Sequence, residues 1–299
     1  MILLAGAGGQ LGRELAACLG VLGPLTLWTR QDVDFSGEDL EREISARKLP
    51  GLKAVVNAAA YTAVDKAESE PDVARRVNAR AAGALAALAE SRGAAIVHYS
   101  TDYVFDGAKS GPYVEEDPPA PLNVYGLTKL EGERAVSGAA SRHVILRTSW
   151  VFSQTGACFP RTVYRLARER DTLDMDATQR GAPTSTELLA AATLVILRRI
   201  LQGSPVWGLF HLTASGETTW HGFASRVVAR AAELGLELRL RPEAITARTV
   251  PDLSRPAKRP LNSALSTAKI REAYGLTLPC WQYHADRFAD GLRRQADLA

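Results

Sequence analysis

Short apolar stretches alternate with amphipathic ones through the first half of the chain. Strands are expected at Met1–Ala5, Leu25–Trp28, Lys53–Asn57, Ala94–Ser100 and His143–Phe152. Helical periodicity of apolar residues occupies the segments between them, and the longest such segment is Val73–Arg92. Regular alternation of strand and helix is typical of a parallel sheet with helices on both faces. The first half of the chain therefore predicts a doubly wound α/β fold.

The alternation becomes irregular after Trp150. Helices are expected at Phe159–Glu169, Thr186–Leu201, Thr218–Leu234 and Trp281–Arg294, and strands at Thr172–Met175, Gly208–Leu212 and Leu236–Arg241. The helix from Thr186 and the strand from Gly208 should rejoin the sheet. We therefore predict a larger domain made of residues 1–152 and 184–214, and a smaller, discontinuous α/β domain made of residues 153–183 and 215–299. A site is expected in the crevice between them.

The composition is that of ordinary globular protein. The 299 residues are 46% hydrophobic and 23% charged, and a net charge of +3 is too small to favour nucleic acid or a membrane surface as a partner. No apolar run is long enough for a membrane-spanning helix. Cys18, Cys158 and Cys280 are too far apart for a metal site or a disulfide framework. Because the start of the chain has no signal-peptide pattern, a reducing, cytoplasmic location is expected.

A glycine turn follows the first expected strand. Gly6, Gly9 and Gly12 lead into a helical segment, which is the strand–turn–helix context of a dinucleotide site. Gly6 permits a tight turn, Gly9 lets a pyrophosphate approach the helix N-terminus, and Gly12 allows close helix packing. Gln10 and Leu11 are included in the expected cofactor site. The sheet is therefore expected to be of the Rossmann type, with a glycine turn that binds no ligand as the alternative.

The end of the second strand bears on the choice of cofactor. An acidic residue there would accept the ribose hydroxyls of NAD, but Arg30 comes first and suits a 2′-phosphate. NADPH is therefore favoured, with NADH as the alternative. Asp34 and Phe35 follow, and Asp34 either caps the next helix or lies near the adenine. Small side chains after the third strand should let the cofactor approach the backbone. The residues of that segment included in the cofactor site are Ala59, Ala60 and Tyr61.

A tyrosine and a lysine four residues apart carry the candidate chemistry. Tyr125 and Lys129 begin a helical segment, so both side chains point to one face. The ammonium would stabilise a phenolate and lower the pKa of Tyr125, which makes the phenol a usable proton donor. Thr101, at the end of the fourth strand, is placed to hold a carbonyl oxygen. Together they would polarise a ketone and protonate the alkoxide formed by hydride transfer, whereas a chance Tyr-x-x-x-Lys pair is the alternative.

Several longer strings accompany the glycine turn and the Tyr-Lys pair. They are Asn57-Ala-Ala-Ala-Tyr-Thr-Ala-Val-Asp-Lys-Ala-Glu68, Ser100-Thr-Asp-Tyr-Val-Phe-Asp-Gly107, Pro121-Leu-Asn-Val-Tyr-Gly-Leu-Thr-Lys129, Arg147-Thr-Ser-Trp-Val-Phe152, Gly181-Ala-Pro-Thr184 and Arg259-Pro-Leu-Asn-Ser263. With them the chain resembles the dTDP-4-dehydrorhamnose reductase family, within the extended short-chain dehydrogenase/reductase superfamily. The resemblance runs along almost the whole chain.

The resemblance implies an activity and a set of residue roles. Enzymes of this family use hydride from NADPH or NADH to reduce the 4-keto group of dTDP-4-dehydro-L-rhamnose, the last step of dTDP-L-rhamnose synthesis. Tyr125 would be the general acid, Lys129 would also bind the nicotinamide ribose, and Thr101 would hydrogen-bond the keto oxygen. The chain would act on a dTDP-sugar as a monomer or a homodimer. The implied sugar contacts are Val64, Asp102, Tyr103 and Trp150.

A basic, proline-flanked segment near the C-terminus supplies one more candidate. A nucleotide sugar carries a diphosphate, and the glycine turn already serves the pyrophosphate of the cofactor. Arg259 lies in a segment too stiff to be a flexible tail, so we expect it to bind the substrate diphosphate. The alternative is that it covers surface or pairs with an acid.

The chain also departs from the family pattern. The strings Thr155-Gly-Ala-Cys-Phe159 and Thr178-Gln179 differ from the usual ones, which bears on nucleotide-sugar contacts and not on the reduction. Some family members dimerise around Mg²⁺ held by glutamates. Glu14 and Glu187 match two of those positions, but Gly291 stands where a third glutamate is expected. No metal is therefore predicted.

Two alternative functions use the same fold. A non-catalytic cofactor-binding subunit, such as the one that accompanies methionine adenosyltransferase, has no chemical need for Thr101, Tyr125 and Lys129 together. A nucleotide-sugar epimerase or dehydratase needs further acid and base groups, and only Asp102 is available beside Thr101. Reduction is therefore the simpler chemistry.

Overall fold

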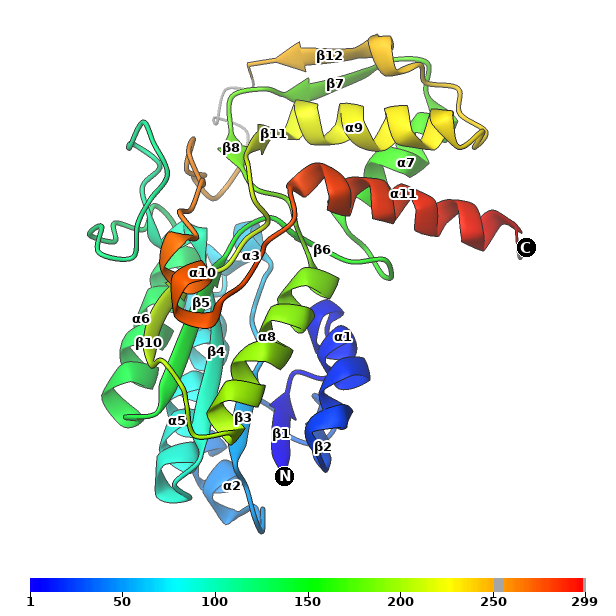
Figure 1. The fold of residues 1–299 in the computed structure, drawn as a ribbon. Helices are drawn as coiled ribbons and strands as arrows, with labels where there is room; N and C mark the ends of the chain where they lie inside the picture. Colours follow the sequence, from blue (N-terminus) through cyan, green and yellow to red (C-terminus); the bar gives the residue numbers. More distant parts are fainter. Residues whose placement is uncertain (250–254, 298–299) are drawn as a thin grey trace.

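A parallel sheet of six strands forms the centre of the computed structural model, which describes residues 1–249 and 255–297 (Figure 1). The strand order is β10-β5-β4-β3-β1-β2, and every neighbouring pair is parallel. The strands are β1 (Ile2–Ala5), β2 (Leu25–Trp28), β3 (Ala54–Asn57), β4 (Ala95–Thr101), β5 (His143–Thr148) and β10 (Gly208–His211).

Helices cover both faces of this sheet, because successive residues of a strand point to opposite sides. Residues such as Leu3 and Val55 pack in one apolar core with α2 (Leu40–Ala46), α5 (Ala81–Ser91) and α6 (Val124–Ala139). Their neighbours Leu4 and Val56 pack in a second core with α1 (Gln10–Leu19) and α8 (Thr186–Leu201). The Rossmann-type doubly wound sheet predicted from the sequence is confirmed.

The long helix predicted over Val73–Arg92 is interrupted. It consists of α4 (Pro71–Arg75), a π-helical turn (Arg76–Arg80) and α5. The backbone of Asn78, inside this turn, meets α6 so closely that a Cβ on Gly132 would lie 2.2 Å from the Asn78 carbonyl oxygen. Single π-helical turns are frequent at functional sites, and this one lies between the cofactor-side loop and the helix of Tyr125.

A second group of elements lies beyond the carboxyl ends of the strands, at the top of Figure 1. A small core of its own includes Val163, Leu173 and Val228, whereas Phe223 and Phe288 join the core on the α1–α8 face of the sheet. The predicted division into two domains remains a prediction. The elements of this group are α7 (Phe159–Glu169), β7 (Leu173–Asp176), β8 (Arg180–Gly181), β11 (Thr218–Thr219), α9 (Trp220–Glu233), β12 (Ile245–Arg248) and α11 (Trp281–Asp297).

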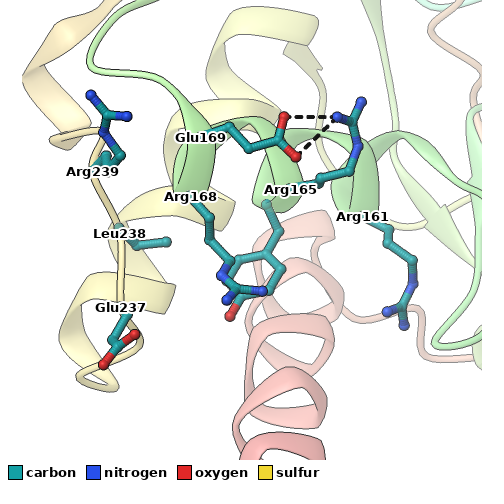
Figure 2. Close-up of a pocket in the computed structure, with 8 residues that line it drawn as sticks. Arg161, Arg165, Arg168, Glu169, Glu237, Leu238 and Arg239 are labelled. Carbon is teal, nitrogen blue, oxygen red and sulfur yellow. Dashed lines mark hydrogen bonds and ion pairs between the residues drawn. The ribbon is translucent and has the colours of Figure 1, made fainter.

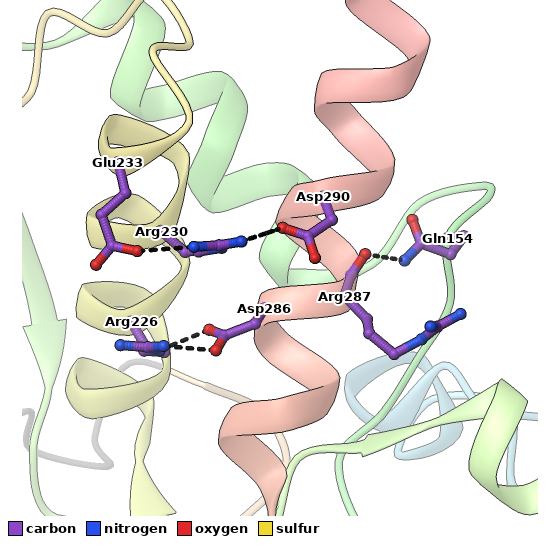
Figure 3. Close-up of polar contacts among 7 residues, drawn as sticks. All are labelled: Gln154, Arg226, Arg230, Glu233, Asp286, Arg287 and Asp290. Atoms are coloured by element: carbon purple, nitrogen blue, oxygen red, sulfur yellow. Dashed lines mark hydrogen bonds and ion pairs between the residues drawn. The ribbon is translucent and has the colours of Figure 1, made fainter.

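Charged side chains join α9 to α11 (Figure 3). Both guanidinium nitrogens of Arg226 that face α11 bind the carboxylate of Asp286, and Arg230 binds Asp290 one turn further along at 2.9 Å. Because the spacing is four residues on each helix, the two pairs repeat in register.

The basic strand predicted at Leu236–Arg241 is wrong. The backbone N–H groups of Arg239 and Leu240 both donate to the carbonyl oxygen of Ala167, so this segment wraps the end of α7. The strand follows later, as β12, and pairs in parallel with β7. The alternation of leucines at positions 236, 238 and 240 misled the prediction because two of them, Leu236 and Leu240, are buried without a strand partner in this part of the described chain.

Shorter elements complete the described chain. The single strand predicted over His143–Phe152 is broken after Thr148 and resumes as β6 (Val151–Phe152), which pairs with β9 (Thr184–Ser185). Helices α3 (Val64–Ala67) and α10 (Ala268–Tyr274) and three 3₁₀ turns (Gly20–Leu22, Asp102–Val104, Pro242–Ala244) lie in connections. Within the described ranges, no helix is both long and apolar enough to cross a membrane.

Candidate active site

The backbone of the glycine turn between β1 and α1 packs closely against its neighbours. Gly6 has φ +81°, and a Cβ there would lie 2.5 Å from the backbone nitrogen of Ala59. A Cβ on Gly12 would lie 2.1 Å from the Gly6 carbonyl oxygen, so the helix can approach the strand only with glycine at this position. Gly9 precedes the first turn of α1 and supplies no side-chain cap. The N–H groups of this helix end are therefore available to an anion.

A cavity of about 890 Å³ opens beside this turn. Its walls include most of the residues predicted to hold the cofactor; these are Gly6, Gly9, Arg30, Asp34, Phe35, Ala59, Ala60 and Tyr61. Lining residues that were not predicted to hold the cofactor include Lys66, Glu70, Val73 and Val77. Of these, Glu70 accepts a hydrogen bond from the Tyr61 hydroxyl at 2.7 Å.

Three predicted cofactor residues do not line the cavity. Gly12 serves helix packing, and Leu11 packs against the apolar core. The Gln10 side chain reaches toward the second group of elements, where its Nε2 donates to the carbonyl oxygen of Ala157 at 2.6 Å. Gln10 therefore links the glycine turn to the loop before α7.

The loop after β2 contains the exposed Arg30 and a carboxylate, Asp32, that is hydrogen-bonded within the loop. The carboxylate of Asp32 accepts hydrogen bonds from the Thr29 N–H and hydroxyl, both at 2.8 Å, and these bonds hold its pKa below the ordinary value. Asp34 accepts from the Ser36 hydroxyl and N–H in the same way. Asp32 thus shapes the turn, while Arg30 is exposed at the wall of the cavity.

Thr101, Tyr125 and Lys129 come together where β4 ends and α6 begins. Asn123 caps α6, its side chain accepting from the N–H of Gly126 at 2.8 Å. The Thr101 hydroxyl lies beside the Tyr125 phenol and counteracts part of the rise in its pKa. The ammonium of Lys129 is buried and donates to the carbonyl oxygen of Tyr99 at 2.6 Å. The structure therefore brings the three predicted catalytic residues to one place.

The pKa of Tyr125 differs in direction from the expectation. Although its ring is partly exposed, desolvation by the surrounding protein raises the pKa of Tyr125 to about 12, and Lys129 is not among the groups that shift it. Burial also lowers the pKa of Lys129 to about 8, against the opposing charge of Glu133. At neutral pH the phenol is therefore protonated and the lysine is close to its titration range.

A buried ion pair supports this helix from behind. The guanidinium of Arg147 donates to both carboxylate oxygens of Glu133, at 2.8 and 2.7 Å, and the Ser100 hydroxyl donates to the same carboxylate at 2.5 Å. Both partners are nearly inaccessible to solvent. A buried bidentate pair of this kind fixes side-chain geometry, and it ties β4 and β5 to the helix of Lys129.

Asp102 is buried beside Thr101 and is surrounded by hydroxyl groups. It accepts from Thr101 at 2.9 Å and from Ser149 at 3.2 Å, and the Ser263 hydroxyl lies beside it. Desolvation outweighs these bonds and raises the pKa of Asp102 to about 6. Ser149 and Ser263 were not predicted as site residues, although both belong to the sequence strings that are specific to the family.

Arg259 returns from the C-terminal third of the chain to the same region. It forms an ion pair with Asp65 at 2.9 Å and is hydrogen-bonded to Tyr103. The ring of Tyr103 in turn meets that of Tyr125 edge to face, with centroids 5.7 Å apart. Val64, the residue before Asp65, begins α3. The expected substrate residues Val64, Tyr103 and Arg259 therefore lie in the same region as Tyr125.

Trp150 lies between β5 and β6 and bridges to the second group of elements. Its ring stacks on Trp220, the first residue of α9, with centroids 3.6 Å apart and planes within 5° of parallel. A Cβ on Gly181 would lie 2.6 Å from the Trp150 ring. The backbone near Trp150 connects to Asp102 through Ser149. Trp220 was not predicted from the sequence.

Asn78 joins the loop of Tyr61 to the helix of Tyr125. Its side-chain oxygen accepts from the Tyr61 N–H at 2.9 Å, and its amide nitrogen donates to the Tyr61 carbonyl at 3.2 Å and to the Thr128 hydroxyl at 3.0 Å. Asn78 is fully buried. Asn78 therefore links the loop of Tyr61 to the helix of Tyr125 through buried hydrogen bonds.

The carboxylates matched to a metal site do not fit a metal ion. Glu187 pairs with Arg287 at 3.1 Å, and the proximity of Glu187 contributes, after burial, to a raised pKa of Glu14. A Cβ on Gly291 would lie 2.2 Å from the side-chain oxygen of Gln154, so a carboxylate at this position would require the Gln154 side chain to move. Among residues 1–249 and 255–297, no group of three or more His, Cys, Asp or Glu side chains is arranged to hold a metal.

Another cavity, of about 590 Å³, lies between α7 and the segment 237–239 (Figure 2). Two of its four arginines pair with acids: Arg165 with Glu169 at 2.9 Å and Arg239 with Asp171 at 2.7 Å. None of the predicted site residues lines it. The chemistry described above is therefore at the edge of the parallel sheet and not in this cavity.

Comparison with known proteins agrees with this geometry. Residues 1–294 match the family model described as RmlD substrate binding domain. The dTDP-4-dehydrorhamnose reductase of Escherichia coli strain K12 is 44% identical over 294 residues, which are 97% of each chain. A crystal structure of the dTDP-4-dehydrorhamnose reductase of Clostridium acetobutylicum has a TM-score of 0.87 and 35% identity, and covers 98% of this chain and 99% of that one.

A second solved structure contains a cofactor. The dTDP-4-dehydrorhamnose reductase of Bacillus anthracis, in complex with NADP, has a TM-score of 0.83 and 29% identity, and covers 96% of this chain and 97% of that one. The matches span the sheet, the glycine turn, the Thr101–Tyr125–Lys129 cluster and the C-terminal helix together. The chain therefore belongs to the dTDP-4-dehydrorhamnose reductase family.

Proposed function

We propose that the chain reduces the 4-keto group of dTDP-4-dehydro-L-rhamnose to give dTDP-L-rhamnose. One observation carries the proposal: Thr101, at the end of β4, lies beside the phenol of Tyr125, which stands one turn of α6 before the buried Lys129. A polarised ketone needs donors on its oxygen and a proton source, and this pair supplies both. The names of the relatives support the same substrate.

The bound nicotinamide supplies the hydride, and the chain supplies the proton and the orientation. Thr101 and Tyr125 hold the keto oxygen, and Tyr125, protonated at neutral pH, gives its proton to the developing alkoxide. Lys129 keeps its place through the Tyr99 carbonyl, and we assign it to the phenolate that remains once NADPH is bound, although it does not shift the pKa of Tyr125 in the free protein. Val64, Asp102, Tyr103 and Trp150 orient the sugar, and Arg259 contacts the diphosphate.

NADPH is the proposed cofactor, and the residues present fit it. The glycine turn offers N–H groups at the start of α1, and Arg30 is exposed at the wall of the 890 Å³ cavity, where a 2′-phosphate would carry its charge. Residues 1–152 and 184–214 would form the cofactor domain, and residues 153–183 and 215–299 the sugar-nucleotide domain. The free cysteines Cys18, Cys158 and Cys280 suit a cytoplasmic enzyme.

Replacing Arg30 tests the cofactor assignment. Arg30→Ala should weaken NADPH binding by about 10- to 150-fold and leave NADH nearly unchanged, because a charge-assisted contact to the 2′-phosphate is lost. Both dissociation constants are measured by fluorescence titration. Arg42→Ala removes the same charge from an exposed position of α2 outside the cavity and should change neither constant. An equal loss for both cofactors would show that Arg30 does not contact the phosphate.

The activity itself is tested with the purified chain, NADPH and enzymatically prepared dTDP-4-dehydrorhamnose. Oxidation of NADPH, followed by its absorbance, should accompany formation of dTDP-rhamnose in equal amounts. dTDP-glucose, which lacks the keto group, should cause no oxidation. If NADPH is bound but not consumed with the keto sugar, the proposed substrate is wrong.

A further inference from the structure

Trp150 has an unusual backbone conformation. Its φ of +48° is the one positive φ of a non-glycine residue among residues 1–249 and 255–297. A bulky side chain rarely adopts this left-handed conformation, and it persists only where the surroundings hold it. The residue stands at the break between β5 and β6, directly after Ser149, whose hydroxyl donates to Asp102. The contacts that fix the conformation of Trp150 therefore also affect the geometry of the substrate site.

Two neighbours hold the indole of Trp150. Trp220 stacks on it nearly parallel, at 3.6 Å between centroids. Gly181, in β8, lies so close that any side chain there would collide with the ring. Stacking buries aromatic surface and fixes the angle of both rings. The ring of Trp150 thus has one orientation, which is set by elements outside the parallel sheet.

Trp220 is itself fixed by three contacts. Its indole N–H donates to the side-chain oxygen of Gln179 at 3.1 Å. Its ring packs against Phe159 with centroids 4.5 Å apart. Its backbone begins α9, where the Thr219 hydroxyl caps the helix by accepting from the N–H of Gly222 at 3.1 Å. The orientation of Trp220 is therefore fixed by its own contacts and does not depend on Trp150.

We propose that Trp220 is a positioning residue for the reaction, holding Trp150 at the angle at which its ring meets the sugar. The proposal deepens the proposed function and rests on it. Trp220, supported by Gln179, acts through Trp150 and does not touch the reacting atoms. Its effect should therefore fall on sugar binding, and neither on proton transfer nor on the cofactor.

The stack has its own spectroscopic signature. Two indoles in close contact couple their electronic transitions and give a paired band in the far-ultraviolet circular dichroism spectrum. All five tryptophans are in the described part of the chain, and Trp150–Trp220 is the pair of tryptophan rings in contact there. Trp150→Phe and Trp220→Phe should each remove the paired band. Trp207→Phe, which changes a tryptophan packed elsewhere against the core, should leave it unchanged.

Steady-state kinetics test whether Trp220 positions Trp150 for sugar binding. Trp220→Ala should raise KM for dTDP-4-dehydrorhamnose about 3- to 10-fold, with kcat within twofold and the dissociation constant of NADPH unchanged. Trp220→Phe should recover part of the loss, because it restores an aromatic face. Gln179→Ala keeps both rings and should raise KM by a smaller factor. Trp207→Phe should leave KM unchanged.

Two results would overturn the inference. One is loss of the paired band in Trp220→Phe and Trp220→Ala with KM for the sugar unchanged. The other is an equal change in KM, NADPH binding and melting temperature, which would mean a purely structural role. Both are distinct from failure of the proposed function, in which the parent protein would not reduce the keto sugar although its paired band is present.

Discussion

At the scale of single residues, burial decides the protonation states in the site. Tyr125, Lys129 and Asp102 all depart from their ordinary pKa values chiefly because protein replaces water around them. The sequence predicted the residue types and the shared face of Tyr125 and Lys129. It could not predict the pKa of Tyr125, because that depends on how closely segments distant in sequence enclose the phenol.

Asp102 makes the stability of the protein depend on pH. Its pKa is about 6 in the folded chain and 3.8 ordinarily, so the folded state holds a proton that the unfolded chain releases between these values. The stabilisation by this group is complete below pH 3.8 and is lost as the pH rises through 6. Asp102→Asn cannot ionise, so its free energy of unfolding relative to the parent should rise by on the order of 1–3 kcal/mol from pH 4 to pH 7.

Urea unfolding of both proteins at several pH values measures this difference. A difference that does not change between pH 4 and pH 7 would contradict the burial of an ionisable carboxyl at this position.

At the scale of elements, the hydrophobic periodicity of the sequence predicted which helices and strands exist. It predicted less well where they are interrupted. The helix Thr186–Leu201 has the predicted bounds, because its buried residues recur with helical spacing. The π-helical turn at Arg76–Arg80 and the break at Trp150 were missed. Both are fixed by contacts with other elements, Gly132 for the first and Gly181 and Trp220 for the second. Hydrophobic spacing within one segment contains no information on such contacts.

The arginine–aspartate pairs between α9 and α11 should stabilise the packing of these helices. The Arg226–Asp286 pair is bidentate and about one-third exposed, so a coupling free energy of about 0.5–1 kcal/mol is expected. Urea unfolding of Arg226→Ala, Asp286→Ala and the double variant gives this value. The same cycle on the exposed Arg165–Glu169 pair of α7 is the control and should give about 0.3–0.5 kcal/mol. No coupling between Arg226 and Asp286 would show that helix packing alone holds α9 on α11.

At the scale of the whole molecule, the site depends on segments from opposite ends of the chain. Arg259 pairs with Asp65, and Ser263 lies beside Asp102. The strand–helix alternation predicted the sheet, and strand ends predicted Thr101 and Asp102. Nothing in the spacing of residues indicated that the segment 259–263 reaches Tyr103, because that depends on how the C-terminal part folds back over the sheet.

Replacing Arg259 tests this arrangement. Arg259→Ala should raise KM for the dTDP-sugar about tenfold, because a cation near the diphosphate is lost, and should leave the dissociation constant of NADPH unchanged. Added salt should weaken substrate binding less in the variant than in the parent. Lys258→Ala removes the same charge from an exposed neighbour and should change KM little. An unchanged KM in Arg259→Ala would leave Arg259 only its ion pair with Asp65.

The most direct test of the account is the turnover of Tyr125→Phe with NADPH and dTDP-4-dehydrorhamnose. Only the phenol hydroxyl is removed, so NADPH should bind within about twofold of the parent, and kcat should fall by roughly 10²- to 10⁴-fold because the proton donor is lost. Measuring cofactor binding and kcat on the same preparation separates loss of chemistry from loss of the fold. A variant with tight NADPH binding and near-parental turnover would contradict the assignment of Tyr125 as the acid.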